Sequence, residues 1–163
     1  MTMRLGTIAV LIWLAGAVGA QAAQHTNAAG KYSIWFPDGW TVKVDGNRIL
    51  AQNPKDTVEA VVGPLSDADA DLVDEDVADF VDDELDSMKV VSDTASKRGV
   101  LDVRMLEGTG TDGPDTVIFR AVAVDPNAKD AVIEVVVYGD DDVMDKDDTK
   151  ATVARVLNSL KPL

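Results

Sequence analysis

The sequence of 163 residues contains no cysteine and a single histidine, His25. Without cysteine the chain forms no disulfide, binds no metal through thiolates and carries no lipid on a cysteine side chain. One histidine does not make a histidine-rich zinc site, and it disfavours Ser-His-Asp and Cys-His catalysis. These absences exclude most of the common catalytic arrangements and leave the carboxylates as the main reactive groups.

Basic residues are scarce as well. Lys and Arg number 15 against 29 Asp and Glu, for a net charge of −14. Such an excess repels nucleic-acid phosphates and anionic lipid surfaces, and the scattered Lys and Arg form no basic patch. We therefore expect no nucleic acid among the partners and no membrane association of the mature protein. The partner that this charge favours is a basic protein surface.

Only one stretch, residues 5–20, is long, uncharged and apolar, and Arg4 precedes it. The stretch is shorter than the ~20 residues of a membrane-spanning helix, and it ends in the small residues of Ala20-Gln21-Ala22, as signal peptidase requires. We predict a signal peptide over residues 1–22, a flexible tail over 23–30 and one domain over 31–163. An uncleaved membrane anchor is the alternative. The protein would be exported, periplasmic or secreted, and monomeric.

Cleavage after Ala22 would make His25 the third residue of the mature chain. Weak copper or nickel chelation is chemically feasible there. We interpret His25 as a solvated residue of the tail.

Alternating apolar residues predict a series of strands. The first four are residues 31–36, 40–44, 48–52 and 57–62, separated by turn-forming residues such as Asp45-Gly46-Asn47. Three longer segments, 99–108, 116–124 and 130–138, follow one another closely and predict an antiparallel meander.

Two helices are predicted from spacings of three and four residues. The first has an apolar stripe of Val73, Val77, Phe80, Val81, Leu85 and Met88, and the second covers residues 151–160. The order of strands, helix, strands and helix predicts a single α+β domain, with an antiparallel sheet sandwiched by helices in an α/β/α sandwich.

Two segments of the chain resemble the PsbP-like fold family. They are Tyr32-Ser33-Ile34-Trp35-Phe36-Pro37-Asp38-Gly39-Trp40 near the start of the domain and Val156-Leu157-Asn158-Ser159-Leu160 near its end. The predicted meander between them belongs to the same resemblance. The family includes the PsbP subunit of the oxygen-evolving complex, a yeast Ran-binding import factor and many exported bacterial proteins. The resemblance implies a sheet between helices and an accessory or binding role, not catalysis. It carries over no functional residue and no ligand.

Acidic residues concentrate between Asp67 and Asp86, where 11 acids occur with no Lys or Arg. Asp71, Glu75, Asp79 and Asp83 follow at four-residue steps, and each like-charged pair costs about 0.2–0.5 kcal/mol in an exposed helix. Cations or a basic partner would relieve this repulsion. An ordinary solvated helix face is the alternative.

Candidate metal ligands lie in this segment and in a second acidic cluster that follows residue 139. They are Asp67, Asp69, Asp71, Asp140, Asp142 and Asp145. The first three imitate an EF-hand loop, but Leu72 and Ala78 replace the Gly and the bidentate Glu that the loop requires. A standard EF-hand is therefore excluded. Calcium remains the one candidate cofactor, if the two clusters adjoin, and helix capping is the alternative for the second cluster.

These observations predict an exported, non-catalytic accessory or binding domain with an acidic surface for cations or a basic partner. One alternative is a hydrolase with paired carboxylates, for which Glu59, Glu107 or Glu134 would have to be sequestered. Another is a carrier of a small apolar ligand between sheet and helix. We expect Trp35 and Trp40 to fill the core, and an aromatic binding shelf is the alternative.

Overall fold

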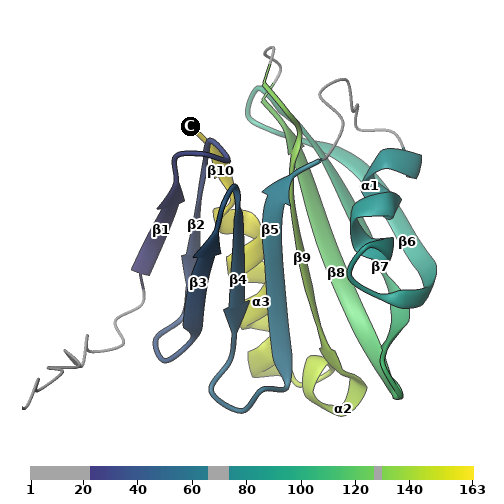
Figure 1. Cartoon of the computed structure of the whole chain (residues 1–163). Coiled ribbons are helices and arrows are strands. Elements are labelled where there is room, and N and C mark those ends of the chain that lie inside the picture. Colours follow the sequence, from purple (N-terminus) through teal and green to yellow (C-terminus); the bar gives the residue numbers. More distant parts are fainter. Residues whose placement is uncertain (1–22, 66–73, 127–129) are drawn as a thin grey trace, which may run out of the picture.

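The computed structural model describes residues 23–65, 74–126 and 130–163. Seven strands form an antiparallel sheet in the order β3-β4-β5-β9-β8-β7-β6, and a small sheet has the order β1-β2-β10 (Figure 1). The strands are β1 (Ala23–Asn27), β2 (Tyr32–Phe36), β3 (Thr41–Asp45), β4 (Arg48–Gln52), β5 (Val58–Pro64), β6 (Asp86–Arg98), β7 (Leu101–Asp112), β8 (Asp115–Asp125), β9 (Ile133–Asp140) and β10 (Lys161–Pro162). The helices are α1 (Asp74–Asp82), α2 (Asp141–Met144) and α3 (Asp147–Ser159).

The core has two halves, one on each face of the large sheet. On one face Ile133, Val135 and Val137 of β9 pack with α3 and with the small sheet. On the other face Val132, Val136 and neighbouring strands pack with α1. Burial on both faces explains why β9 reads as an almost continuous apolar run without the alternation of a half-exposed strand.

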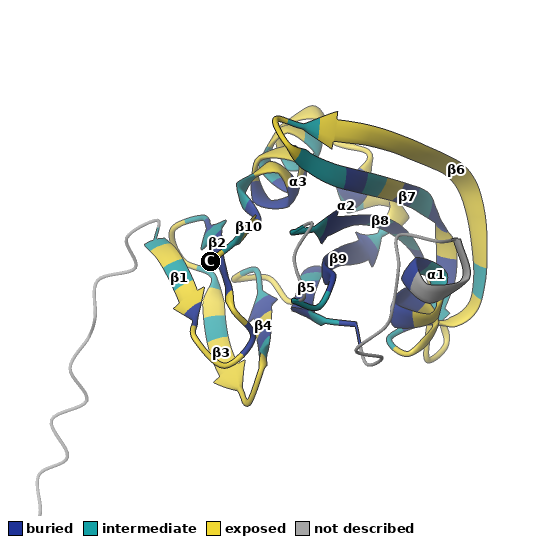
Figure 2. Ribbon diagram, turned by 90° about the horizontal axis from the view of Figure 1, so that it is seen from above, coloured by how far each residue is buried: buried dark blue, intermediate teal, exposed yellow. Residues whose placement is uncertain are grey.

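The predicted α+β class with an antiparallel sheet is confirmed, and the sandwich by helices is confirmed in part. α1 and α3 lie on opposite faces of the large sheet. Figure 2 shows that this cover is incomplete, because β6 is exposed along almost its whole length. The meander is confirmed: β7 pairs with β8 and β8 with β9, both antiparallel. The closing helix is also found, and it begins earlier than predicted, at Asp147.

The predicted first helix is too long at its C-terminal end. Its predicted apolar stripe extends to Met88, whereas α1 ends at Asp82 and the long strand β6 begins at Asp86. Leu85 is still buried, against Gly110 of β7. The sequence shows no apolar alternation in β6, because most of the strand is exposed on both faces and only Met88 packs against the core. Backbone pairing with β7, over almost all of its length, holds it as a strand.

The predicted flexible tail over residues 23–30 is also wrong, because residues 23–27 form β1 and pair with β2. The anchor is Asn27, whose side chain is 2% exposed. Its Nδ2 donates to the carbonyls of Gly46 and Arg48, each at 3.2 Å, and its Oδ1 accepts from the N–H of Gly30 at 2.8 Å. Asn27 thus joins the small sheet to the β3–β4 hairpin, a contact between residues far apart in sequence.

Replacement of Asn27 by alanine should lower the free energy of unfolding by about 2–3 kcal/mol, since it leaves buried backbone groups without partners. The matched control is Thr26→Ala, an exposed position of the same strand, for which we expect a change within about 0.5 kcal/mol. Urea unfolding followed by circular dichroism measures both. Equal effects of the two substitutions would mean that β1 is not anchored by Asn27.

Candidate functional site

The six candidate metal ligands divide between two parts of the chain. Asp67, Asp69 and Asp71 lie outside the described residues. Asp140, Asp142 and Asp145 lie at α2, where Asp140 is the N-cap without a side-chain capping bond and Asp145 forms an ion pair with Lys150 at 3.2 Å. Across the described ranges, no three His, Cys, Asp or Glu side chains are grouped so that they could hold a metal ion. The calcium site stays a prediction.

The side chain of Asp140 does not cap α2 with a hydrogen bond. Other acids, however, occupy the first turns of α2 and α3. Asp141 and Asp142 lie in the first turn of α2, and Asp147 and Asp148 in that of α3. Acids at these positions interact favourably with the positive end of the helix dipole.

The sheet brings acids from distant segments to one end of the molecule. The register pairs Asp86 with Thr111, Asp112 with Asp115, and Val117 with Asp140, so the start of β6, the β7–β8 turn and the end of β9 lie at the same end. Figure 1 shows this end at the bottom, with α2 beside it. We call the acids here the acidic rim: Asp82, Asp83, Asp86, Asp112, Asp115, Asp140, Asp141 and Asp142.

The acidic rim carries unneutralised charge. Within the part of the chain that the structure describes, none of its eight members forms an ion pair. Acids elsewhere are paired, for example Asp102 with Lys97 at 2.6 Å and Asp93 with Arg104 at 2.6 Å. Seven rim members are exposed and Asp140 is half-buried. The rim is therefore a spread negative surface and not a closed chelating site.

One acid differs from all of these, because Glu134 of β9 is completely buried. Neither of its carboxylate oxygens has a hydrogen-bonding partner among the described residues. Burial raises the pKa of Glu134 well above its ordinary value of 4.5, and no neighbouring charge contributes to that shift. Burial without a partner among the described residues therefore favours the neutral, protonated form of this side chain in the folded protein.

Small residues flank Glu134 on the sheet, and two arginines lie beyond them. Its cross-strand neighbours are Gly63 and Ala123. Beyond Gly63, Cγ of Arg48 lies 2.9 Å from the place that a Cβ on Gly63 would occupy. Beyond Ala123 lies Arg104.

Both of these arginines are already bound to other acids. Nη1 of Arg48 lies 2.7 Å from Oε1 of Glu84, and Arg104 forms hydrogen bonds of 2.8 and 2.6 Å to Asp93. Arg48 is thus neutralised by Glu84, in the turn after α1, and Arg104 by Asp93 of β6. Neither arginine is bonded to Glu134, which lies among buried apolar residues of the described chain.

The three strand glutamates do not form the carboxylate pair that a hydrolase would need. Glu59 accepts hydrogen bonds from Gln52 and from the Tyr138 hydroxyl, at 3.0 and 3.1 Å. Glu107 forms an ion pair with Arg120 at 3.1 Å and is 44% exposed. Only Glu134 is sequestered. The sequence predicts that these three glutamates are the acids that could be sequestered, and the structure buries Glu134 alone among them. The strand register shows that they are apart.

His25, Trp35 and Trp40 all contact the core or residues that belong to it. His25, predicted to be solvated, is half-buried in β1, and its ring lies 5.8 Å from that of Phe36. Trp35 lies under the guanidinium of Arg155, and Trp40 stacks on Phe36. Both tryptophans pack against the core, as expected. Burial lowers the pKa of His25.

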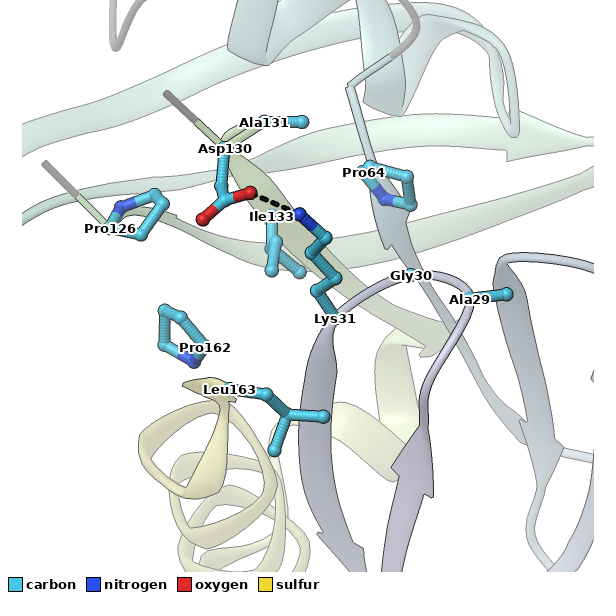
Figure 3. Close-up of a pocket in the computed structure, with 10 residues that line it drawn as sticks. All are labelled: Ala29, Gly30, Lys31, Pro64, Pro126, Asp130, Ala131, Ile133, Pro162 and Leu163. Carbon is cyan, nitrogen blue, oxygen red and sulfur yellow. Dashed lines mark hydrogen bonds and ion pairs between the residues drawn. The ribbon is translucent and has the colours of Figure 1, made fainter. Parts of the chain in front are cut away.

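Cavities occur at the margins of the sheet. One of about 240 Å³ lies between the small sheet and the large one, and Figure 3 shows the ion pair of Lys31 and Asp130 across it, among Pro64, Pro126 and Pro162. A second, of about 310 Å³, lies between α3 and strands β7 and β8, and a third, of about 470 Å³, lies beside Trp40. An apolar carrier would use one of these marginal cavities.

No protein-family model matches the chain, and no curated protein matches it. Solved structures do match. Cyanobacterial PsbP (CyanoP) from Synechocystis superposes with a TM-score of 0.65 at 16% identity, over 91% of this chain and 96% of the other. The chain has the PsbP-like fold. A mutant of the protein Mog1 shares this PsbP-like fold, with a TM-score of 0.58, 9% identity and coverage of 86% of this chain and 95% of the other.

The resemblance inferred from the sequence is thereby confirmed at the level of the PsbP-like fold. At such low identities the match establishes the fold alone and carries over no binding residue. In the described ranges, no helix of this PsbP-like domain has the length and apolarity needed to cross a membrane.

The burial of Glu134 makes stability depend on pH. Because its folded-state pKa is raised, its contribution is fully present below about pH 4.5, the ordinary value, and is lost as the pH rises toward the folded-state value. The loss is about 1.4 kcal/mol per pH unit. Glu134→Gln should therefore gain stability relative to the wild type as the pH increases from 5 to 8.

Unfolding curves in urea, measured at each pH, test this expectation. Glu107→Gln provides the control, because it makes the same chemical change at a half-exposed site on β7, which β8 separates from β9. If the stability difference between wild type and Glu134→Gln stays constant across this range, Glu134 is not held neutral in the folded protein.

Proposed function

We propose that this chain is an exported, non-catalytic binding domain whose acidic rim docks a positively charged protein surface. The observation that carries the proposal is the gathering, at one end of the sheet, of eight acids that form no ion pair with any residue the structure describes. They come from α1 and the start of β6, from the β7–β8 turn, and from the end of β9 with α2. Export is supported by the leader-like residues 1–22 of the sequence.

The spread of the rim favours a protein surface over a chelated metal. A hard cation such as calcium needs six to eight oxygens converging on one point. The described acids do not converge in groups of three. A row of separate exposed charges instead produces a field that attracts and orients a basic partner during encounter.

A binding role also agrees with the chemistry of the interior. The buried acid, Glu134, has no second carboxylate near enough to shift its pKa. Hydrolysis by paired carboxylates depends on two acids whose environments drive their pKa values apart at a shared cleft. Glu59, Glu107 and Glu134 instead have separate partners or none.

Removal of three charges at the rim, compared with removal of three charges elsewhere, tests the acidic rim. Asp112 pairs with Asp115 at the rim end, and Asp102 pairs with Asp125 at the opposite end. We expect the variant D86N/D112N/D115N to bind a labelled oligolysine peptide about tenfold more weakly at low salt. The control D45N/D102N/D125N removes as much charge and should change the affinity less than about twofold. Fluorescence anisotropy measures both.

Salt supplies a second criterion for the same experiment. The difference between the two variants should shrink as salt is added, because the Debye length falls to about 8 Å at physiological ionic strength. Equal losses in the two variants would show that the peptide responds to net charge alone, and the acidic rim would then not be the docking surface.

A comparison of calcium with magnesium distinguishes a spread acidic surface from a coordinated calcium site. The acidic rim alone predicts that millimolar calcium and magnesium raise the melting temperature equally, since a spread surface does not discriminate by ligand geometry. Thermal unfolding in each ion, at matched ionic strength, measures the effect. A larger shift with calcium would support instead the coordinated site predicted from Asp67, Asp69, Asp71, Asp140, Asp142 and Asp145.

A further inference from the structure

A cavity of about 470 Å³ opens between the β4–β5 loop and the start of α3. Trp40 and Pro54 line it from the strand side, and Val143 and Val153 line it from the helix side. Its volume lies within the range of small-molecule sites. Its lining mixes these apolar side chains with polar ones, among them Thr57, Thr149 and Thr152, and with charged groups.

The strand-side wall is held in place by contacts of its own. Oδ1 of Asn53 accepts from the N–H groups of Thr57 and Val58 at 2.9 and 3.3 Å, which fixes the β4–β5 loop. Gly39, with a φ of +83°, lies so close to Pro54 that an added Cβ would be 3.2 Å from its Cγ. A wall that is ordered before binding lowers the entropic cost of holding a ligand.

Trp40 is fixed as well. Its ring stacks on Phe36, with 5.7 Å between the ring centroids and 21° between the planes. Phe36 is itself buried in the core. The cavity therefore has a flat aromatic surface that cannot easily turn away, and such a surface suits an apolar or aromatic ligand group.

The basic residues of this cavity differ from those of the other cavities. In the cavity of Figure 3, Lys31 is paired with Asp130. In the cavity between α3 and strands β7 and β8, Arg120 is paired with Glu107 and Lys150 with Asp145. These ammonium and guanidinium groups are already neutralised by protein carboxylates.

Lys55 and Lys146, by contrast, line the cavity beside Trp40 without forming an ion pair to any described residue. The acid in the same lining, Asp148, accepts a hydrogen bond from the backbone N–H of Thr149 at 2.9 Å. Two lysines and one carboxylate thus border a cavity with an aromatic wall, in a protein whose net charge is −14.

We propose that this cavity binds a small anionic amphiphile. Its apolar or aromatic body would lie against Trp40, Val143 and Val153. Its acidic group, a carboxylate, sulfonate or phosphate, would lie within reach of Lys55 and Lys146. A strongly acidic protein repels anions over most of its surface, so that binding depends on these two lysines for selectivity. The site is independent of the acidic rim.

Two probes with the same kind of aromatic body test the charge requirement. Anilinonaphthalene sulfonate carries an acidic group and phenylnaphthylamine carries none. Fluorescence titration of the folded protein should show that the sulfonate binds about tenfold more tightly than the neutral probe, the effect expected for one partly desolvated charge-assisted contact. Equal affinities would overturn the proposal.

Matched lysine variants locate the site. K55Q/K146Q should weaken sulfonate binding about tenfold, whereas K89Q/K161Q, which removes as much charge at exposed positions away from the cavity, should change it less than about twofold. K55R/K146R keeps the charge and should retain binding, which guards against a loss caused by misfolding. Equal losses in the two glutamine variants would refute the assignment.

NMR of the Trp40 indole tests whether the probe lies against the aromatic wall of the cavity. Titration with the sulfonate should shift the indole N–H resonance of Trp40 in the protein NMR spectrum, and D86N/D112N/D115N should bind the probe as the wild type does. Saturable binding that leaves the Trp40 resonance unmoved would place the probe elsewhere and overturn the proposal.

Discussion

Burial of β9 on both faces is the constraint on which the rest of this structure depends. Its odd-numbered residues complete the core under α3, and its even-numbered residues complete the core under α1. A strand in this position leaves no face for solvent, so every side chain on it must be apolar or must be neutralised. Glu134 meets this requirement through the raised pKa of its buried carboxyl, which favours the neutral form, and it lies between the buried Val132 and Val136.

Charge is distributed unevenly around this core. The cations of the described chain lie mainly where they neutralise acids, as Arg48 does for Glu84 and Arg104 for Asp93. The rim receives none of them, and the cavity beside Trp40 keeps two that have no carboxylate partner. The same strongly acidic chain thus presents one surface for a cationic partner and one small site for an anion.

Much of the fold could be predicted from the sequence, because local chemistry specifies it. The turn at Asp45-Gly46-Asn47, the apolar alternation of β2 and the three-to-four spacing of α3 all appear where the sequence indicated. The two failures, β1 and β6, are strands with little apolar alternation of their own. They exist because Asn27 reaches the β3–β4 hairpin and because β7 offers a backbone to pair with.

By itself the sequence determined the fold class, the excess of acids and the three glutamates that deserved inspection. Each of these follows from local spacing or from composition. Tertiary structure alone decided that Glu134 is buried with no partner among residues 23–65, 74–126 and 130–163. It alone decided that acids from three distant segments share one end of the sheet and that Lys55 and Lys146 border one cavity. The reason is physical: strand register and packing between segments set these distances, and neither is encoded in the spacing of neighbouring residues.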